Sequence, residues 1–455
     1  MNASTHVRWF PVLALIAFGT MLNYLDRTVL GIAAPSLAKD LGLTPAMMGL
    51  AFSAFSWSYA LLQIPGGVFL DRFGTRLTYL IALVGWSACT AAMGVVDSLA
   101  VLVMTRVGVG AFEAPCFPAN SRILASWFPQ QERARANSIY SVGMYAGIGF
   151  FSVPLFYVTS TFGWRGLFYL AGTIGVAFGA IWWRTYRDPS VNTTVSQAEL
   201  RHIEAGGGGE YRGEPTRFDW NHIVALLKHR QVVGASIGQF GGNSTLVFFL
   251  TWFPTYLVTE RGMSYINAGI MASVPYIAAS VGVLFGGFLS DTLLKRTGSA
   301  NLARKLPIVG GLVLASTIVG ANYVPASQNA TVIAILSVAF FGQGMSNLGW
   351  TVISDIAPKN VIGLTGGIFN FSTNLAGIVT PIVIGVFFGL TGSFVGPLIY
   401  IAAVALLGAL SYTIILGDIH RLELDTTQEV SASPPAYAKA SPDSRLTAGR
   451  NSARS

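Results

Sequence analysis

Charged residues are scarce in this sequence. Asp, Glu, Lys and Arg together make up 11% of its 455 residues, and 52% of the residues are hydrophobic. Soluble globular domains carry about 25% charged residues. The mean hydropathy of +0.56 agrees with this composition. The sequence therefore excludes an ordinary soluble protein and predicts an integral membrane protein.

Cysteine and histidine are also rare. Cys89 and Cys116 lie in apolar stretches, which gives no disulfide framework and no metal-ligand spacing. The five histidines lie at the chain ends and in one polar segment, so we expect no histidine proton relay in the membrane. The apolar segments contain no nucleophile–base pair. We therefore expect no enzyme, no metal and no cofactor, and proton coupling would depend on carboxylates.

Twelve apolar segments are long enough to cross a bilayer core of about 30 Å. They lie at residues 9–34, 46–70, 77–96, 99–124, 137–158, 166–183, 232–258, 267–289, 306–323, 331–353, 362–390 and 395–416. The sequence thus predicts an all-α membrane protein with twelve transmembrane helices.

The polar stretches divide these segments into two groups of six. We expect two six-helix halves at residues 1–185 and 231–418, a cytoplasmic linker at 186–230, and a disordered tail at 419–455. A small folded domain is the alternative for the linker, although it has few large apolar residues to bury.

The basic residues predict the topology. Lys39, Arg165 and Arg261 lie in loops assigned to the outside, and Arg27 and Arg106 lie within spans. Arg122 lies at the end of the fourth segment, and all other Lys and Arg residues lie at the termini or in the remaining loops, so the positive-inside rule places both termini in the cytoplasm. The net charge of +8 follows from this distribution and needs no nucleic-acid partner.

Two charges, Asp26 and Arg27, lie inside the first apolar segment. Each costs about 2.5 to 3.5 kcal/mol at the centre of a membrane helix, so each needs a partner or a water-filled cavity. The pair predicts part of a transport site. The alternative is that the helix ends earlier and both side chains reach the interface.

A second pair of charges, Arg106 and Glu113, lies in the fourth segment. Residues seven apart share one helix face, so both side chains can line one cavity. A substrate carboxylate that binds an arginine would weaken its hold on Glu113, which would then bind a proton more tightly. A permanent structural ion pair between Arg106 and Glu113 is the alternative.

Several hydroxyl and amide side chains could bind a polyol. Tyr24 shares a helix face with Arg27, and one helical turn separates Tyr59 from Gln63 and also Asn370 from Asn374. Each of these residues could equally form an interhelical hydrogen bond.

A short loop motif occurs in both halves. The copy after the second segment contains Gly67, Asp71, Arg72, Gly74 and Arg76, and the copy after the eighth contains Gly287 and Asp291. We expect the glycine to allow close helix packing and the Asp to accept hydrogen bonds from the N-terminus of a neighbouring helix.

This loop resembles the G-x-x-x-D-R-x-G-R-R signature of the major facilitator superfamily, with Thr75 in place of one basic residue. The sequences around Asn23–Arg27, 163–168, 249–257 and 357–370 are similar to those of anion:cation symporters, especially bacterial D-galactonate:proton symporters. The resemblance implies that Asp26 and Glu113 take protons and that Arg27 binds the sugar-acid carboxylate.

The sequence departs from the galactonate pattern at three sites. Met144 replaces a glutamine, Gly349 replaces a threonine, and Asn347 replaces a serine at a substrate-binding position. These departures leave the coupling residues in place and put the exact sugar acid in doubt.

From the resemblance we expect a monomeric, proton-driven importer of a small organic anion in the bacterial inner membrane. The substrate would be a galactonate, glucarate or hexuronate type of sugar acid. An aromatic or dicarboxylic acid carrier of the phthalate or tartrate type, and a transporter-like sensor, are the alternatives.

Overall fold

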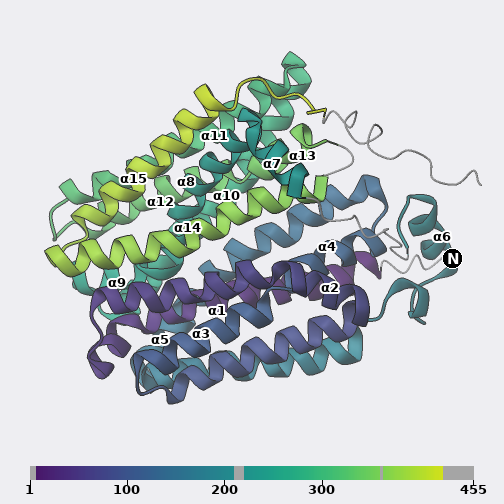
Figure 1. Cartoon of the computed structure of the whole chain (residues 1–455). Coiled ribbons are helices and arrows are strands. Elements are labelled where there is room, and N and C mark those ends of the chain that lie inside the picture. The colour runs from purple at the N-terminus through teal and green to yellow at the C-terminus, as the bar shows by residue number, and fades with distance from the viewer. Residues whose placement is uncertain (1–6, 210–219, 359–361, 424–455) are drawn as a thin grey trace, which may run out of the picture.

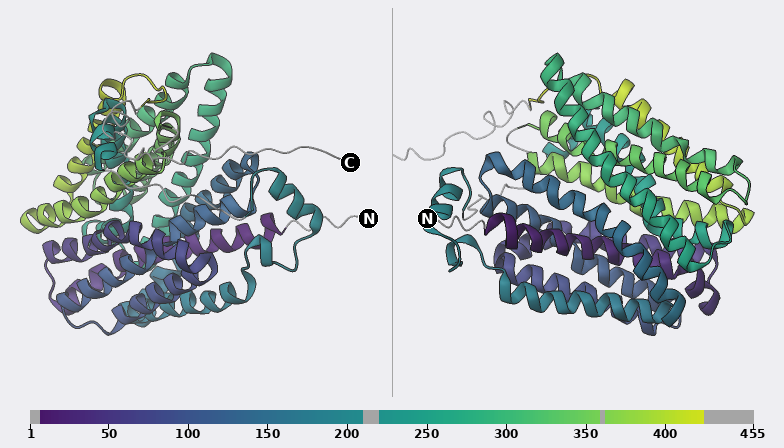
Figure 2. Two further views of the ribbon diagram at one scale, coloured as in Figure 1. Left: turned by 45° about the vertical axis from the view of Figure 1, so that its right-hand side comes forward. Right: turned by 180° about the vertical axis from the view of Figure 1, so that it is seen from behind.

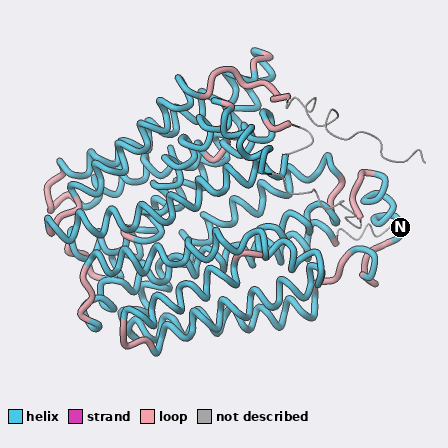
Figure 3. Tube along the Cα trace, in the orientation of Figure 1, coloured by secondary structure: helices cyan, strands magenta, loops and turns pink. Residues whose placement is uncertain are grey.

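The computed structural model describes residues 7–209, 220–358 and 362–423, and all regular secondary structure in these ranges is helical (Figure 3). Nine helices in this part of the chain are long and apolar enough to cross a membrane. The predicted all-α membrane fold is therefore confirmed.

The first half begins with a π-helical turn that leads into α1. Its elements are η1 (Arg8–Val12), α1 (Leu13–Leu41), α2 (Pro45–Ala92), η2 (Met93–Val95), α3 (Leu99–Glu113), α4 (Cys116–Trp127) and α5 (Gln130–Thr185). With 48 and 56 residues, α2 and α5 are each long enough for two crossings. Gly74 in α2 and Gly163 in α5 have φ angles of 75° and 71°, so each helix breaks at a left-handed glycine between two predicted spans.

The second half follows the same plan after a linker that contains short helices. The linker elements are η3 (Pro189–Val191), α6 (Gln197–Ala205) and α7 (Trp220–Lys228). The second half consists of α8 (Arg230–Thr251), α9 (Phe253–Thr255), η4 (Tyr256–Glu260), α10 (Tyr265–Thr297), α11 (Ala300–Ser316), η5 (Thr317–Tyr323), α12 (Asn329–Ser346), α13 (Gly349–Ile356), α14 (Ile362–Thr391), α15 (Val395–Leu410) and η6 (Ser411–Ile415).

The fourth span of each half is interrupted at a similar position. Pro115 separates α3 from α4 and has no N–H to donate to the helix ladder. Asn347 and Leu348 separate α12 from α13. In both halves a glycine of the second span lies close to this break. A Cβ atom added to Gly66 of α2 would lie 3.1 Å from the Pro115 ring, and one added to Gly286 of α10 would lie 2.9 Å from Cα of Met345.

The two halves form two helix bundles that converge near α9 and diverge toward α6 and α7 (Figures 1 and 2). Where they converge, the helices touch through glycine. A Cβ at Gly49 of α2 would lie 2.5 Å from the Pro381 carbonyl oxygen of α14, and one at Gly31 of α1 would lie 2.6 Å from the Leu250 carbonyl oxygen of α8. At the other end of the first crossing of α2, shortly before the break at Gly74, Gly67 has open space beside it. We call the first region the closed end and the region beyond Gly67 the open end.

The predicted disordered tail, residues 419–455, lies outside the described residues from position 424 onward. The first part of the tail is packed. Ile419 and Leu422 are buried against the core of the second half, and the Leu422 backbone N–H donates to the Ile356 carbonyl at 2.8 Å.

Candidate substrate and proton site

Arg27 and Glu113 form an ion pair in the middle of the first half. The Nη2 and Nε atoms of Arg27, on α1, lie 3.0 and 3.1 Å from Oε2 of Glu113, on α3. The Glu113 side chain is fully buried, whereas the Arg27 side chain is 15% exposed. The structure therefore joins the residues predicted to bind substrate and proton, and it leaves part of the Arg27 side chain exposed.

Three aromatic rings surround the Arg27 guanidinium. Its central carbon lies 4.8 Å from the ring centre of Tyr24, 4.7 Å from Phe55 and 4.9 Å from Tyr59. Tyr24 is three residues before Arg27 on α1, and Phe55 and Tyr59 stack one turn apart on α2. Cation–π contacts of this kind hold a desolvated guanidinium in place and leave its N–H groups free for anions.

Arg106 is not the partner of Glu113. No ion pair within 4 Å joins these two described side chains, and Nε and Nη1 of Arg106 have no hydrogen-bond partner in the described structure. Arg106 instead lies 5.1 Å from the Phe55 ring and is 2% exposed. The alternative of a permanent Arg106–Glu113 pair therefore does not match this conformation.

Asp26 is buried close to the Arg27–Glu113 pair. It is 2% exposed, which does not fit the alternative in which it reaches the membrane interface. Its carboxyl group is close enough to Glu113, Arg106 and the Trp86 indole to interact with each of them. Asp26 and Glu113 thus lie in one buried group of charges.

Some of the predicted polyol-binding residues lie where the halves meet. The Asn370 amide of α14 donates a short hydrogen bond to Oε1 of Gln63 on α2, and Nδ2 of Asn374 donates to the Asn370 carbonyl at 2.9 Å. Tyr59 is buried, and Asn347 is half-buried at the break between α12 and α13. The structure therefore brings amides of both halves together, one helical turn along α2 from Tyr59, which is part of the Arg27 cage.

Sequence reasoning missed another contact between the halves. The Tyr145 hydroxyl of α5 donates to Oε1 of Gln343 on α12 at 3.4 Å, and both side chains are buried. Gln343 is one turn before Asn347, so helical spacing on α12 could have indicated it.

Gly349 has a structural reason to lack a side chain. A Cβ at this position would lie 2.8 Å from Oε1 of Gln239 and 3.0 Å from the Tyr412 hydroxyl. A threonine would therefore require these neighbours to move. Met144 is 7% exposed and adds an apolar surface in the same span as Tyr145.

The loop motif makes contacts different from those expected. Asp71 accepts from Nη1 of Arg122 on α4 at 3.0 Å, and this partner is a side chain and not the N-terminus of a helix. Close packing occurs at Gly66, whereas Gly67 has open space. These two expectations about the motif were wrong for this conformation.

The rest of the motif lies at the surface of the open end. Gly74 forms the left-handed break of α2. Arg76 donates to the Trp183 carbonyl and lies 3.8 Å from the Trp183 ring centre. Arg72 lies 5.5 Å from the Phe73 ring, and Asp291 of the second copy is exposed.

A separate cluster of charges attaches the linker to the first half. Arg8 binds Glu132 of α5 and Glu199 of α6, both at 2.9 Å, and His202 contacts Glu132 at 3.1 Å. The hydrogen bond from the Arg8 guanidinium lowers the pKa of Glu132. The linker prediction contained no such docked helix.

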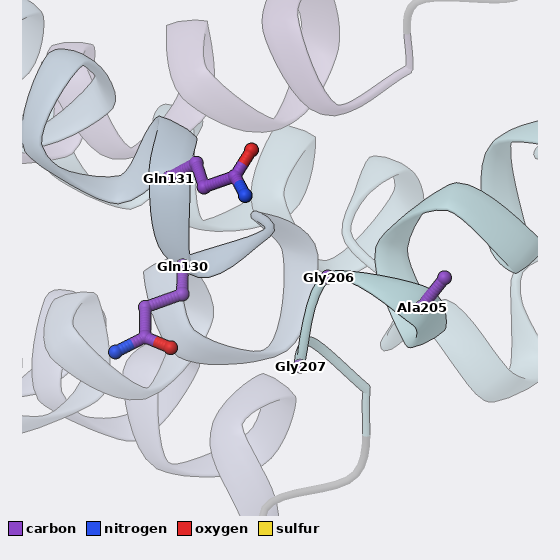
Figure 4. Close-up of a pocket in the computed structure, with 5 residues that line it drawn as sticks. All are labelled: Gln130, Gln131, Ala205, Gly206 and Gly207. Atoms are coloured by element: carbon purple, nitrogen blue, oxygen red, sulfur yellow. The ribbon is translucent and has the colours of Figure 1, made fainter.

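A surface hollow of about 360 Å³ lies beside this cluster (Figure 4). It is lined by Gln130, Gln131, Ala205, Gly206 and Gly207. These residues carry no charge to bind an anion, and they lie outside the apolar helices. The hollow is therefore not the candidate transport site.

Comparison with known proteins agrees with this architecture. Residues 16–381 match the family model of the Major Facilitator Superfamily. The chain therefore belongs to this superfamily, whose members are membrane transporters and not enzymes.

Two similar relatives have names that specify sugar acids. The D-galactonate transporter of Escherichia coli O6:H1 is 41% identical over 91% of this chain and 97% of the relative. The probable galactarate/D-glucarate transporter GudP of Escherichia coli K12 is 43% identical over 92% and 96%.

The fold is also similar to a crystal structure of a bacterial homologue of the human lysosomal transporter Spinster, in an inward-facing and unoccupied conformation. The TM-score is 0.68 at 21% sequence identity, with 91% of this chain and 95% of that chain covered.

Proposed function

We propose that this protein imports a sugar acid together with protons. The observation that carries the proposal is the Arg27–Glu113 ion pair, in which one caged guanidinium holds a buried carboxylate while 15% of the Arg27 side chain stays exposed. The galactonate and galactarate/glucarate names of the relatives support the substrate class.

The proposed coupling is a competition for Arg27. Protonation of Glu113 removes its negative charge and frees the guanidinium, which then binds the substrate carboxylate through two parallel N–H groups. Arg27 stays charged throughout, because guanidinium is not deprotonated in proteins. When substrate leaves and Glu113 loses its proton, the ion pair forms again. Asp26, in the same buried group of charges, is proposed as the second proton-binding carboxylate.

The amide and hydroxyl groups around the cage are proposed to bind the rest of the substrate. The Gln63–Asn370 hydrogen bond joins α2 to α14, so a substrate hydroxyl that replaces it would contact both halves at once. Tyr24, Tyr59, Asn347 and Asn374 would supply further contacts, with Arg106 supporting the charged group.

Transport is proposed to proceed by rocking of residues 1–185 against 231–418 about this site, with 186–230 as the linker. The positive-inside rule places both termini, and with them the open end, in the cytoplasm of a bacterial inner membrane. The structure would then represent an inward-open state of a monomer. Gly67, Asp71, Arg72, Gly74, Arg76 and Asp291 would take part in closing that end.

Uptake into proteoliposomes tests the proposal. Labelled galactonate, glucarate and a hexuronate should accumulate when an inward pH gradient is imposed, and replacement of sodium by choline should leave the rate unchanged. Accumulation of every compound without a gradient would refute proton coupling. Competition by phthalate or tartrate, with no effect of sugar acids, would instead identify an aromatic or dicarboxylic acid carrier.

A further inference from the structure

We infer that Asn23 is a positioning residue for Glu113, whose carboxamide binds the Glu113 side chain in both of its protonation states. This inference rests on the proposed function, in which Glu113 is the proton-binding carboxylate.

Asn23 and Glu113 both have buried polar atoms without partners. Asn23 is 2% exposed, and neither Oδ1 nor Nδ2 has a hydrogen-bond partner in the described ranges. Asn23 lies one helical turn before Arg27 on α1, so it shares a helix face with the guanidinium that holds Glu113 at 3.0 Å, and its carboxamide is within interaction distance of the Glu113 carboxylate. Oε2 of Glu113 is occupied by Arg27, whereas Oε1 has no partner. Two neighbouring buried side chains therefore each have polar atoms without a partner.

An unpaired amide at this position has a cost. Each buried polar group without a hydrogen bond costs about 1 to 3 kcal/mol, and an apolar side chain of similar size would avoid this cost. A carboxamide is suited to a neighbour that changes its protonation state, because Nδ2 can donate to a carboxylate and Oδ1 can accept from a protonated carboxyl group. The position therefore calls for a residue that offers a donor and an acceptor together.

Other groups also face Glu113 and set its charge. They are Tyr24, Asp26 and Arg27 on α1, Tyr59 on α2, Arg106 on α3 and Cys116 next to Pro115. The two arginines favour the carboxylate, and Asp26 opposes it. When Arg27 turns to the substrate, Glu113 is protonated, and Asn23 remains beside it as a neutral acceptor.

The asymmetry between the two hydrogen bonds gives a measurable effect. A hydrogen bond to a charged carboxylate is stronger than one from a neutral carboxyl group, so the carboxamide favours the deprotonated form. Removal of the carboxamide should therefore raise the pH at which Glu113 loses its proton, by about one pH unit.

Infrared spectroscopy of the purified full-length protein tests this effect without substrate. The carboxyl C=O band that disappears in Glu113→Gln identifies Glu113, and its intensity is followed as a function of pH. Asn23→Leu should move this titration upward by about one pH unit, and Asn23→Thr, which keeps a donor and an acceptor, should move it less.

Asn120→Leu is the matched control. Asn120 is a buried asparagine of α4 that donates to Oγ1 of Thr20 on α1 at 3.0 Å. Its replacement should lower thermal stability and leave the Glu113 titration unchanged.

Three results would overturn the inference: an unchanged titration in both Asn23 variants, an equal shift in Asn120→Leu, or no titrating band assigned to Glu113. If Asn23→Leu does not fold, the smaller shift expected of Asn23→Thr decides. A wild-type protein that fails to accumulate any sugar acid would refute the proposed function. The infrared titration would still report whether Asn23 affects the protonation of Glu113, because it is measured without substrate.

Discussion

Replacing Arg27 by lysine keeps the positive charge and removes the planar fork. In the structure both Nε and Nη2 of Arg27 reach one carboxylate, at 3.1 and 3.0 Å, and three rings flank the guanidinium plane. A lysine ammonium is a compact point charge that cannot present two parallel N–H groups in this geometry. We therefore expect Arg27→Lys to lose at least one charge-assisted hydrogen bond to the substrate carboxylate.

The expected loss is about 1.5 to 3 kcal/mol, because that is the contribution of a hydrogen bond to a charged group. This range corresponds to roughly 10- to 150-fold weaker binding. Equilibrium binding of labelled galactonate or glucarate to purified protein measures the change. Arg165→Lys is the control, because Arg165 binds Asp40 at 2.6 Å but is 47% exposed, and the loss of an exposed pair has little effect.

Wild-type affinity in Arg27→Lys would refute the assignment of Arg27 as the carboxylate receptor. Equal losses in Arg27→Lys and Arg165→Lys would show that the effect does not arise at the caged site.

Three further predictions concern coupling, conformation and the linker. Glu113→Gln should abolish uphill accumulation but retain exchange of external for internal substrate, and a variant that still concentrates substrate would remove Glu113 from coupling. Gly49→Ala should destabilise the closed end, because the new Cβ would lie 2.5 Å from the Pro381 carbonyl oxygen. A cysteine introduced at the closed end should then react faster with a thiol reagent added from outside. An unchanged labelling rate would contradict this reasoning. The pKa of Glu132 is lowered by its hydrogen bond to Arg8, so this pairing stabilises the folded protein fully above the unfolded-state pKa of about 4.3. The stabilisation is lost as the pH falls through the lower pKa of the folded state. Glu132→Gln should therefore lower the melting temperature at pH 7, and its difference from wild type should shrink in acid; a constant difference would refute the ion-pair contribution.

The membrane fold and the buried charges follow from local properties of the sequence. A backbone in lipid must satisfy its own hydrogen bonds, so apolar segments of sufficient length predict helices without knowledge of their neighbours. Asp26, Arg27 and Glu113 stand out because a charge in an apolar segment is costly unless it has a function. Helical spacing also placed Tyr24 beside Arg27, and the structure agrees.

Partners on other helices depended on tertiary packing. Arg106 and Glu113 share a helix face, but seven residues separate them by about 10.5 Å along the axis, which is beyond the reach of an ion pair in this conformation. Glu113 instead meets Arg27, 86 residues away in sequence, and Gln63 meets Asn370, 307 residues away. Helical periodicity gives the direction of a side chain but not the helix that it faces, so these contacts were decided only by the way in which the two bundles pack.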